Sequence, residues 1–360
     1  DLVTQIADVI GLGFEVVYIL FESIKVEFPQ FLILFYRLQI SIETIGRFCD
    51  INTNKPEWRG SDIFGNRSAN YLDMSNPEVA AWAENELARI ITEYKLDLLR
   101  VDHNISHRDY FAIRDADTGI PECVSVRHIN NVYKMYNNLK KRFPDVIFEN
   151  CAGGGGRTDL GMMKAFNHTW VSDCQCAPHS VYITNGMTMA LPPERVDRLF
   201  AGMGCHSFGS FDLHMRNTML THMSLNVISP AAAQMNTQQL EFVRHSTDIY
   251  KNFIRKFLPD SKVYHHTPDT LSAEKSGFIA LEVAAEDNSK GAAAVFSLPL
   301  AGTDRFRVRL KGVDLSLMYN VTLDNSGATY KVSGAELAQS GVEVLIPSQL
   351  SSELILYEAL

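Results

Sequence analysis

Apolar and polar residues follow two different patterns along the chain, and the change between them comes near Pro259. Before this point, short apolar segments alternate with longer segments whose apolar residues recur at helical spacing. We expect strands at Phe14–Leu20, Leu96–Val101, Val146–Phe148 and His168–Val171, and helices at Pro77–Tyr94, Arg127–Phe143, Glu194–Met203, Met215–Val227 and Gln238–Phe257. Such alternation is typical of a parallel sheet, closed or open.

The first of these helices has a clear start signal. Ser75-Asn76-Pro77 offers a side chain that can cap a helix, followed by proline at the first helical position. Apolar residues then recur on one face, including Val79, Ala83 and Leu87. The pattern therefore predicts an amphipathic helix that packs on the sheet.

After Pro259 the pattern predicts short strands. Two apolar segments flank the turn-forming residues 286–291, which indicates a hairpin. Further strands without helices between them are expected at Arg305–Leu310, Tyr319–Leu323, Val342–Ile346 and Glu353–Tyr357. We therefore expect two domains, an α/β domain over residues 1–259 and an antiparallel β domain over residues 260–360.

Composition and charge exclude several classes of protein. With 46% hydrophobic residues among 360, the chain can form a large core, which excludes disorder. A net charge of −9 without a basic block argues against nucleic-acid binding. The apolar runs are too short to span a bilayer, and the six scattered cysteines do not resemble a disulfide framework. We favour a cytoplasmic location over a periplasmic or secreted one.

Polar residues interrupt or follow the apolar strands at three places. Asp102 follows Leu98–Val101, four glycines follow the strand that ends near Cys151, and Asp173 follows Trp170 and Val171. In an α/β barrel the catalytic groups lie at the carboxyl ends of the strands. Two carboxylates on neighbouring strands are the catalytic groups of glycoside hydrolysis.

Two other interpretations of these segments are weaker. The glycine run lacks the Lys-Ser/Thr of a P-loop and the spaced glycines of a dinucleotide site, so it predicts a sharp turn. His103 and His107 have the spacing of a zinc motif, but Asn104 stands where that motif needs glutamate. We therefore expect a polar loop there, with no metal and no cofactor.

At these segments the chain resembles the family 36 glycoside hydrolases, typified by bacterial α-galactosidases. The family's nucleophile motif, Lys-Trp-Asp-x-Asn, is similar to Arg100-Val101-Asp102-His103-Asn104 of this chain. The family's Cys-Ala-Ser-Gly-Gly-Gly-Arg and Trp-x-Ser-Asp motifs resemble residues 151–157 and Trp170-Val171-Ser172-Asp173. An upstream arginine-containing segment resembles the stretch from Arg67 to Val79. The resemblance runs from about Gly13 to Leu360.

The resemblance implies a fold and a set of roles. The expected fold is α/β, a TIM-type (β/α)8 barrel followed by a C-terminal antiparallel β-sandwich. The family's first barrel strand has no match, so another segment closes the barrel or the chain is a fragment. Asp102 would be the nucleophile and Asp173 the general acid/base. The implied sugar-binding residues are Arg67, Arg100, Asn104, Cys151, Gly154 and Trp170.

We therefore expect a retaining exo-glycosidase that hydrolyses terminal α-galactosides of an oligosaccharide or glycoconjugate. The family's Asp-Asp-Gly-Trp segment is replaced by Leu20-Phe21-Glu22-Ser23, which leaves the identity of the sugar open. The alternatives are an α-N-acetylgalactosaminidase, another α-glycosidase of the family, and a non-catalytic carbohydrate-binding relative. By analogy with the family, a homo-oligomer is also expected.

Overall fold

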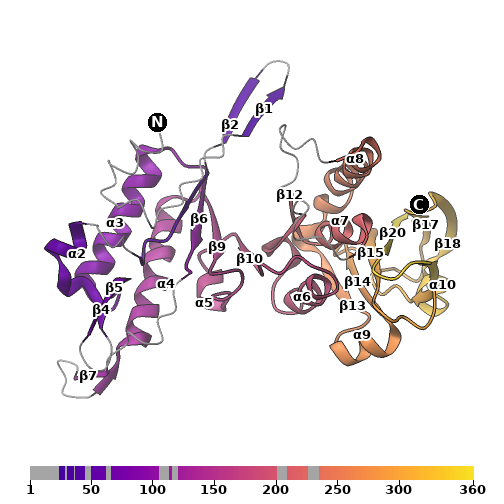
Figure 1. Ribbon diagram of the computed structural model, residues 1–360. Coiled ribbons are helices and arrows are strands. Elements are labelled where there is room, and N and C mark those ends of the chain that lie inside the picture. The colour runs from indigo at the N-terminus through magenta and orange to yellow at the C-terminus, as the bar shows by residue number, and fades with distance from the viewer. Residues whose placement is uncertain are drawn as a thin grey trace. The chain divides into compact units, whose positions relative to one another are not determined.

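The structure is a computed structural model that describes residues 24–28, 31–35, 37–44, 50–61, 66–104, 113–115, 121–200, 209–225 and 235–360 (Figure 1). The chain forms two compact units, residues 1–169 and 170–360. The expected domain boundary at residue 260 stays a prediction. None of the helices in the described ranges is long and apolar enough to cross a membrane.

A parallel sheet with strand order β3-β6-β9-β10 lies at the centre of the first unit. Its strands are β3 (Arg37–Ile40), β6 (Leu98–Asp102), β9 (Ile147–Cys151) and β10 (His168–Trp170), of which β10 ends at the first residue of the second unit. Helices α3 (Pro77–Glu93) and α4 (Val124–Arg142) follow β3 and β6 in the sequence (Figure 1). This arrangement confirms the predicted alternation of parallel strands and helices.

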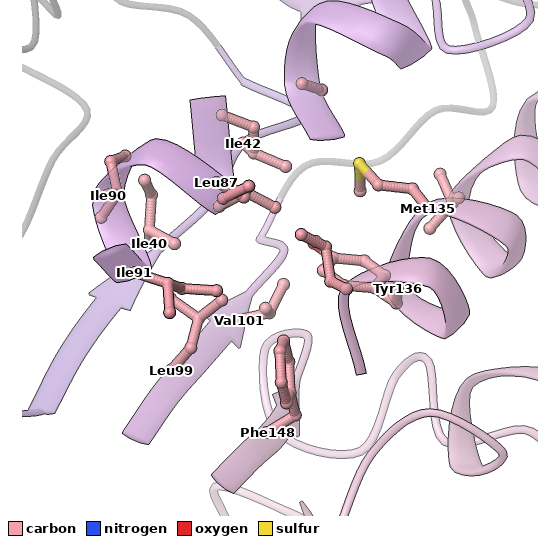
Figure 2. Close-up of a cluster of buried hydrophobic side chains, with 14 of the residues drawn as sticks. Ile40, Ile42, Leu87, Ile90, Ile91, Leu99, Val101, Met135, Tyr136 and Phe148 are labelled. Atoms are coloured by element: carbon pink, nitrogen blue, oxygen red, sulfur yellow. The ribbon is translucent and has the colours of Figure 1, made fainter. Parts of the chain in front are cut away.

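Helix α3 begins where its cap predicts. The Asn76 side chain accepts a hydrogen bond from the backbone N–H of Glu78, and Pro77 occupies the first turn. The apolar face of α3 and that of α4 pack on one face of the sheet (Figure 2). The cluster contains residues of both helices and of β3, β6 and β9, among them Leu87, Ile91, Met135, Tyr136, Leu99, Val101 and Phe148. Burial of each such side chain contributes about 1.5–3 kcal/mol to the free energy of unfolding.

The first unit also contains shorter elements. Three antiparallel pairs are formed by β1 (Ile24–Phe28) with β2 (Phe31–Phe35), β4 (Arg59–Ser61) with β5 (Arg67–Leu72), and β7 (Ile113–Asp115) with β8 (Pro121–Cys123). The short helices are α2 (Asp50–Asn54) and α5 (Leu160–Met163). The predicted strand Phe14–Leu20 lies outside the described residues.

In the second unit, two predicted helices are corrected. Where a helix was expected over Glu194–Met203, the chain forms β11 (Val196–Phe200), which pairs in parallel with β12 (His222–Leu225). Asp197 and Arg198 are polar but buried in β11, so the apolar residues on either side of them have the spacing of an amphipathic helix. The helix expected over Met215–Val227 is α7 (Phe211–Met219), which ends before β12; α6 (His179–Met187) and α8 (Thr237–Asn252) complete this region.

The C-terminal part of this unit contains a six-stranded antiparallel sheet of order β13-β14-β15-β20-β17-β18. Its strands are β13 (Lys262–His265), β14 (Phe278–Ala284), β15 (Lys290–Ser297), β17 (Met318–Leu323), β18 (Ala328–Ser333) and β20 (Ser352–Ala359). A second antiparallel pair is β16 (Arg305–Val308) with β19 (Val342–Leu345). One apolar cluster contains residues of both sheets, which supports the expected sandwich.

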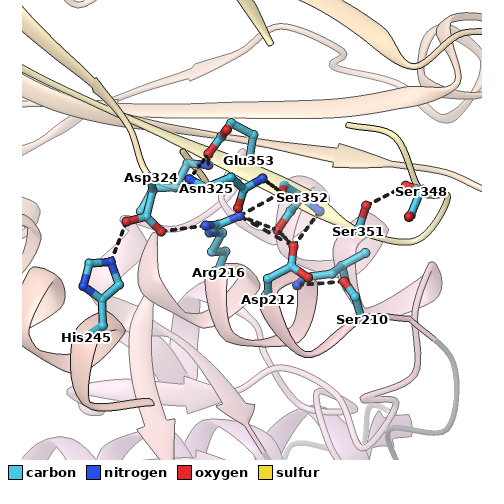
Figure 3. A network of polar contacts seen from close by, with 12 residues as sticks. Ser210, Asp212, Arg216, His245, Asp324, Asn325, Ser348, Ser351, Ser352 and Glu353 are labelled. Atoms are coloured by element: carbon cyan, nitrogen blue, oxygen red, sulfur yellow. Dashed lines mark hydrogen bonds and ion pairs between the residues drawn. The ribbon is translucent and has the colours of Figure 1, made fainter. Parts of the chain in front are cut away.

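Two helices accompany this sheet, α9 (Thr270–Ser276) and α10 (Gly334–Gln339). Helix α10 lies between β18 and β19, so the prediction of strands without helices between them is wrong there. A polar network joins α7 to β20 and to the residues after β17 (Figure 3). In it, buried Arg216 donates to Asp324 Oδ2 (2.6 Å) and to the carbonyl of Ser352 (2.8 Å).

Candidate active site

Asp102 is the last residue of β6, at the carboxyl end of a parallel strand. Its carboxylate is half-buried and accepts hydrogen bonds from neutral groups on both of its oxygens. Gln39 Nε2 of β3 donates to Oδ2 (3.0 Å), and the backbone N–H of Gly153 donates to Oδ1 (3.2 Å). The sheet thus presents an oriented carboxylate at the edge where barrel enzymes place their catalytic groups.

The glycine run forms the sharp turn that the sequence predicts. Gly153 and Gly154 have φ of +54° and +81°, a backbone region that favours glycine. The turn is closed by the N–H of Ala152, which donates to the carbonyl of Gly154 (2.9 Å). The N–H of Gly153 also donates to Asn104 Oδ1 (2.7 Å), so Asn104 and Asp102 accept from the same backbone N–H.

Arg100 and Cys151 lie together in a buried group on β6 and β9. Arg100 Nη1 pairs with Glu149 Oε1 (2.5 Å), and Nη2 donates to Cys151 Sγ (3.3 Å). Burial is the largest of the causes that raise the pKa of the Cys151 thiol to about 12, so the thiol stays protonated. Glu149 was missed by the sequence analysis, although a glutamate inside an apolar strand beside Arg100 was a signal for an ion pair.

A second buried group lies where β3 ends. Glu43 accepts from Arg157 Nη1 (2.7 Å) and lies 3.1 Å from His128 Nε2, which also contacts the Tyr71 hydroxyl (2.6 Å). Burial raises the pKa of Glu43, but the nearby Arg157, His103 and His128 outweigh it and hold that pKa well below its usual value. Because Arg157 follows the glycine turn, its ion pair with Glu43 anchors that turn to the loop after β3.

Arg67 lies on the β4–β5 hairpin. Its side chain is exposed, and Nη1 donates to the carbonyls of Glu57 and Arg59 (both 3.1 Å). Arg67 is thus held by β4 and by the turn before it, and it takes no part in the hydrogen bonds that connect Asp102, Asn104 and Gly153. Of the histidines in the zinc-like spacing, His103 is buried 3.8 Å from Glu43, and His107 lies outside the described residues.

In the second unit, Asp173 follows β10 and is exposed. Trp170 Nε1 donates to Asp173 Oδ1 (2.9 Å), so these two predicted site residues are in contact. Arg198 of β11 supports the loop after Asp173, because its Nη2 donates to the carbonyl of Cys174 (3.1 Å) and to Gln175 Oε1 (3.0 Å). Burial lowers the pKa of Arg198 to about 10.

Similar proteins occur both among curated proteins and among solved structures. The bifunctional α-galactosidase/sucrose kinase of Mediterraneibacter gnavus is 24% identical over 85% of this chain and 31% of its own length. A probable α-galactosidase G of Emericella nidulans is 26% identical over 80% of this chain and 37% of its own. An α-galactosidase variant from Geobacillus stearothermophilus, solved in complex with raffinose, is 20% identical, with a TM-score of 0.76 over 91% of this chain and 45% of its own.

The chain therefore spans about a third of the length of these curated relatives. The structural likeness, at 20% identity, shows the fold, and the parallel sheet with its helices fits an α/β barrel. The Melibiase family model matches residues 22–258 of the 360. Because this match covers more than half of the chain, the chain belongs to the Melibiase family, which confirms the resemblance to the family 36 glycoside hydrolases.

Proposed function

We propose that this chain hydrolyses terminal α-galactosides with retention of configuration at the anomeric carbon. The observation that carries the proposal is the carboxylate of Asp102 at the end of β6, oriented by donors to both of its oxygens. Relatives that cover most of the chain are named α-galactosidases, which supports galactose as the sugar.

In the proposed mechanism, Asp102 attacks the anomeric carbon while Asp173 gives its proton to the departing oxygen. A covalent glycosyl-enzyme ester forms. Asp173 then takes a proton from water, whose oxygen attacks the anomeric carbon, and the Asp102 carboxylate leaves with the electron pair of the ester bond. The hydrogen bond from Trp170 orients the Asp173 carboxyl for both proton transfers.

The remaining site residues are assigned by the same proposal. Asn104 and Gly154, at the glycine turn, would bind sugar hydroxyls, as would Trp170 and the exposed Arg67. Arg100 and Cys151 would line the base of the site. The finer fold is also proposed: the parallel strands belong to a (β/α)8 barrel over residues 1–259, and residues 260–360 form the β-sandwich.

The test is nitrophenol release from aryl α-galactoside, α-N-acetylgalactosaminide and α-glucoside. Asp102→Asn is compared with the unsubstituted chain and with Asp145→Asn, which changes an exposed aspartate of the same unit. We expect release from the galactoside, abolished only by Asp102→Asn. Release from another glycoside alone would show that the enzyme acts on a different sugar. Sugar binding without release would show that the chain is a non-catalytic carbohydrate-binding protein.

A second measurement tests the roles of the two carboxylates. Azide can replace water on the glycosyl-enzyme when the general base is missing. Asp173→Ala is therefore expected to cleave aryl galactosides with good leaving groups and, with azide, to form the α-galactosyl azide. Asp102→Ala with azide is expected to give the β-azide, because only one displacement then occurs. The opposite pair of products would reverse the two roles.

A further inference from the structure

Gln39 is positioned by the sheet to contact Asp102. In the parallel register Gln39 lies beside Arg100, and Ile40 beside Val101. Because side chains alternate along strands, Gln39 and Asp102 face the side of the sheet opposite the buried Leu38, Ile40 and their neighbours. The Gln39 amide then lies within 3.0 Å of Asp102 Oδ2.

We propose that Gln39 is a positioning residue that makes the Asp102 carboxylate a better leaving group in the second half of the reaction. This inference rests on the proposed function. The amide supplies a donor without a positive charge, whereas the neighbouring cation, Arg100, is paired with Glu149. Gln39 thereby orients the carboxylate without neutralising it.

The hydrogen bond differs in strength between the two halves of the reaction. A bond to a charged carboxylate is stronger than a bond to a neutral ester. The amide therefore stabilises Asp102 whenever it is ionised, before the attack and after the ester bond breaks. When the amide is removed, the more basic carboxylate attacks at least as fast but leaves more slowly, by about 10- to 100-fold.

The experiment uses the full chain with Gln39→Leu, which keeps the volume of the side chain and removes its donor. With 2,4-dinitrophenyl α-galactoside we expect kcat and KM to fall together by about 10- to 100-fold, with a burst of dinitrophenol of one equivalent per site. The control is Asn138→Ala, because Asn138 also donates from an amide to a carboxylate, Glu84 Oε2 (3.1 Å), but does so between α4 and α3. It should show no burst and unchanged kcat and KM.

A second variant tests the same proposal if Gln39→Leu does not fold. Gln39→Glu places a carboxyl beside Asp102, and the two then share one proton at low pH. The protonated form of the introduced carboxyl donates as the amide does, so activity survives in acid. As the pH rises this donor is lost and the two charges repel, so the alkaline limb of the pH–rate profile moves to lower pH.

The possible outcomes separate the two proposals. A fall in kcat/KM without a burst, together with an unshifted alkaline limb for Gln39→Glu, overturns the role of Gln39 and leaves the function intact. If the unsubstituted chain releases no phenol from any of the glycosides, both proposals fail. A burst with parallel falls in kcat and KM supports both.

Discussion

Replacing Arg157 by methionine is expected to destabilise the first unit strongly, because the Glu43 carboxylate then loses its guanidinium partner. The two side chains are 8% and 1% exposed and their charged atoms lie 2.7 Å apart. Removing one member of a buried pair costs about 3–5 kcal/mol of unfolding free energy, since the other charge stays buried. At typical urea sensitivities this lowers the unfolding midpoint by roughly 1 M or more.

The loss is also expected to depend on pH. The depressed pKa of Glu43 contributes stability above the ordinary glutamate value of about 4.3, and this contribution is lost as the pH falls through the folded value. In Arg157→Met, only His103 and His128 are left to oppose burial, so the pKa of Glu43 rises. Stability is then lost as the pH rises through that raised value, so the loss caused by the substitution is larger near pH 7 than near pH 4.

Tryptophan fluorescence during urea unfolding measures this loss. Trp58 and Trp82 lie in the first unit with ring centroids 5.7 Å apart, so they report on its unfolding. The double variant Glu43→Leu/Arg157→Met should recover most of the lost stability, because no unpaired charge remains buried. A loss below about 1 kcal/mol for Arg157→Met, or an equal loss at both pH values, would refute the reasoning.

Three further predictions concern other parts of the chain. Buried Cys151 should resist iodoacetamide at pH 8 until the first unit unfolds, as peptide mass spectrometry can show; rapid native labelling would contradict its burial. In thermal or urea melts, Arg216→Met should cost the second unit about 3–5 kcal/mol and His245→Ala less than about 1 kcal/mol, because their side chains are 1% and 53% exposed; equal losses would contradict this. Gly156→Ala should reduce glycosidase activity, because the added Cβ would lie 2.6 Å from the carbonyl oxygen of Ala152. The control Gly186→Ala, where the added Cβ meets open space, should keep its activity. Equal activities of the two variants would count against the role of the turn.

The sequence predicted those elements whose local signals agree with their tertiary surroundings. Helix α3 begins at its proline because Asn76 caps it, and its apolar face is the one that packs on the sheet. The glycine run makes the predicted sharp turn because Gly153 and Gly154 adopt positive φ. In these cases backbone chemistry and burial both point to the same structure.

Elements with buried polar residues could not be predicted in the same way. Strand β11 carries Asp197 and Arg198 inside the second unit, 4% and 1% exposed, and Arg198 is satisfied by acceptors on the loop after Asp173. Partners so far away in the sequence leave no local pattern, so the segment resembled an amphipathic helix. Gln39 was missed for the same reason, because its partner Asp102 is 63 residues further along the chain.

In the described residues, the buried arginines and the proposed nucleophile, Asp102, have different partners. Arg100 is paired with Glu149 and Arg157 with Glu43, so each of these buried cations has an acid of its own. The hydrogen bonds to Asp102 from Gln39 and Gly153 come from neutral groups, which orient the carboxylate and leave its charge in place. A cation paired directly with Asp102 would stabilise the charged form that must be consumed in the attack and so raise the barrier. Glu149 on β9 therefore serves the proposed chemistry by pairing with Arg100, the cation that lies two residues from Asp102 on the same strand.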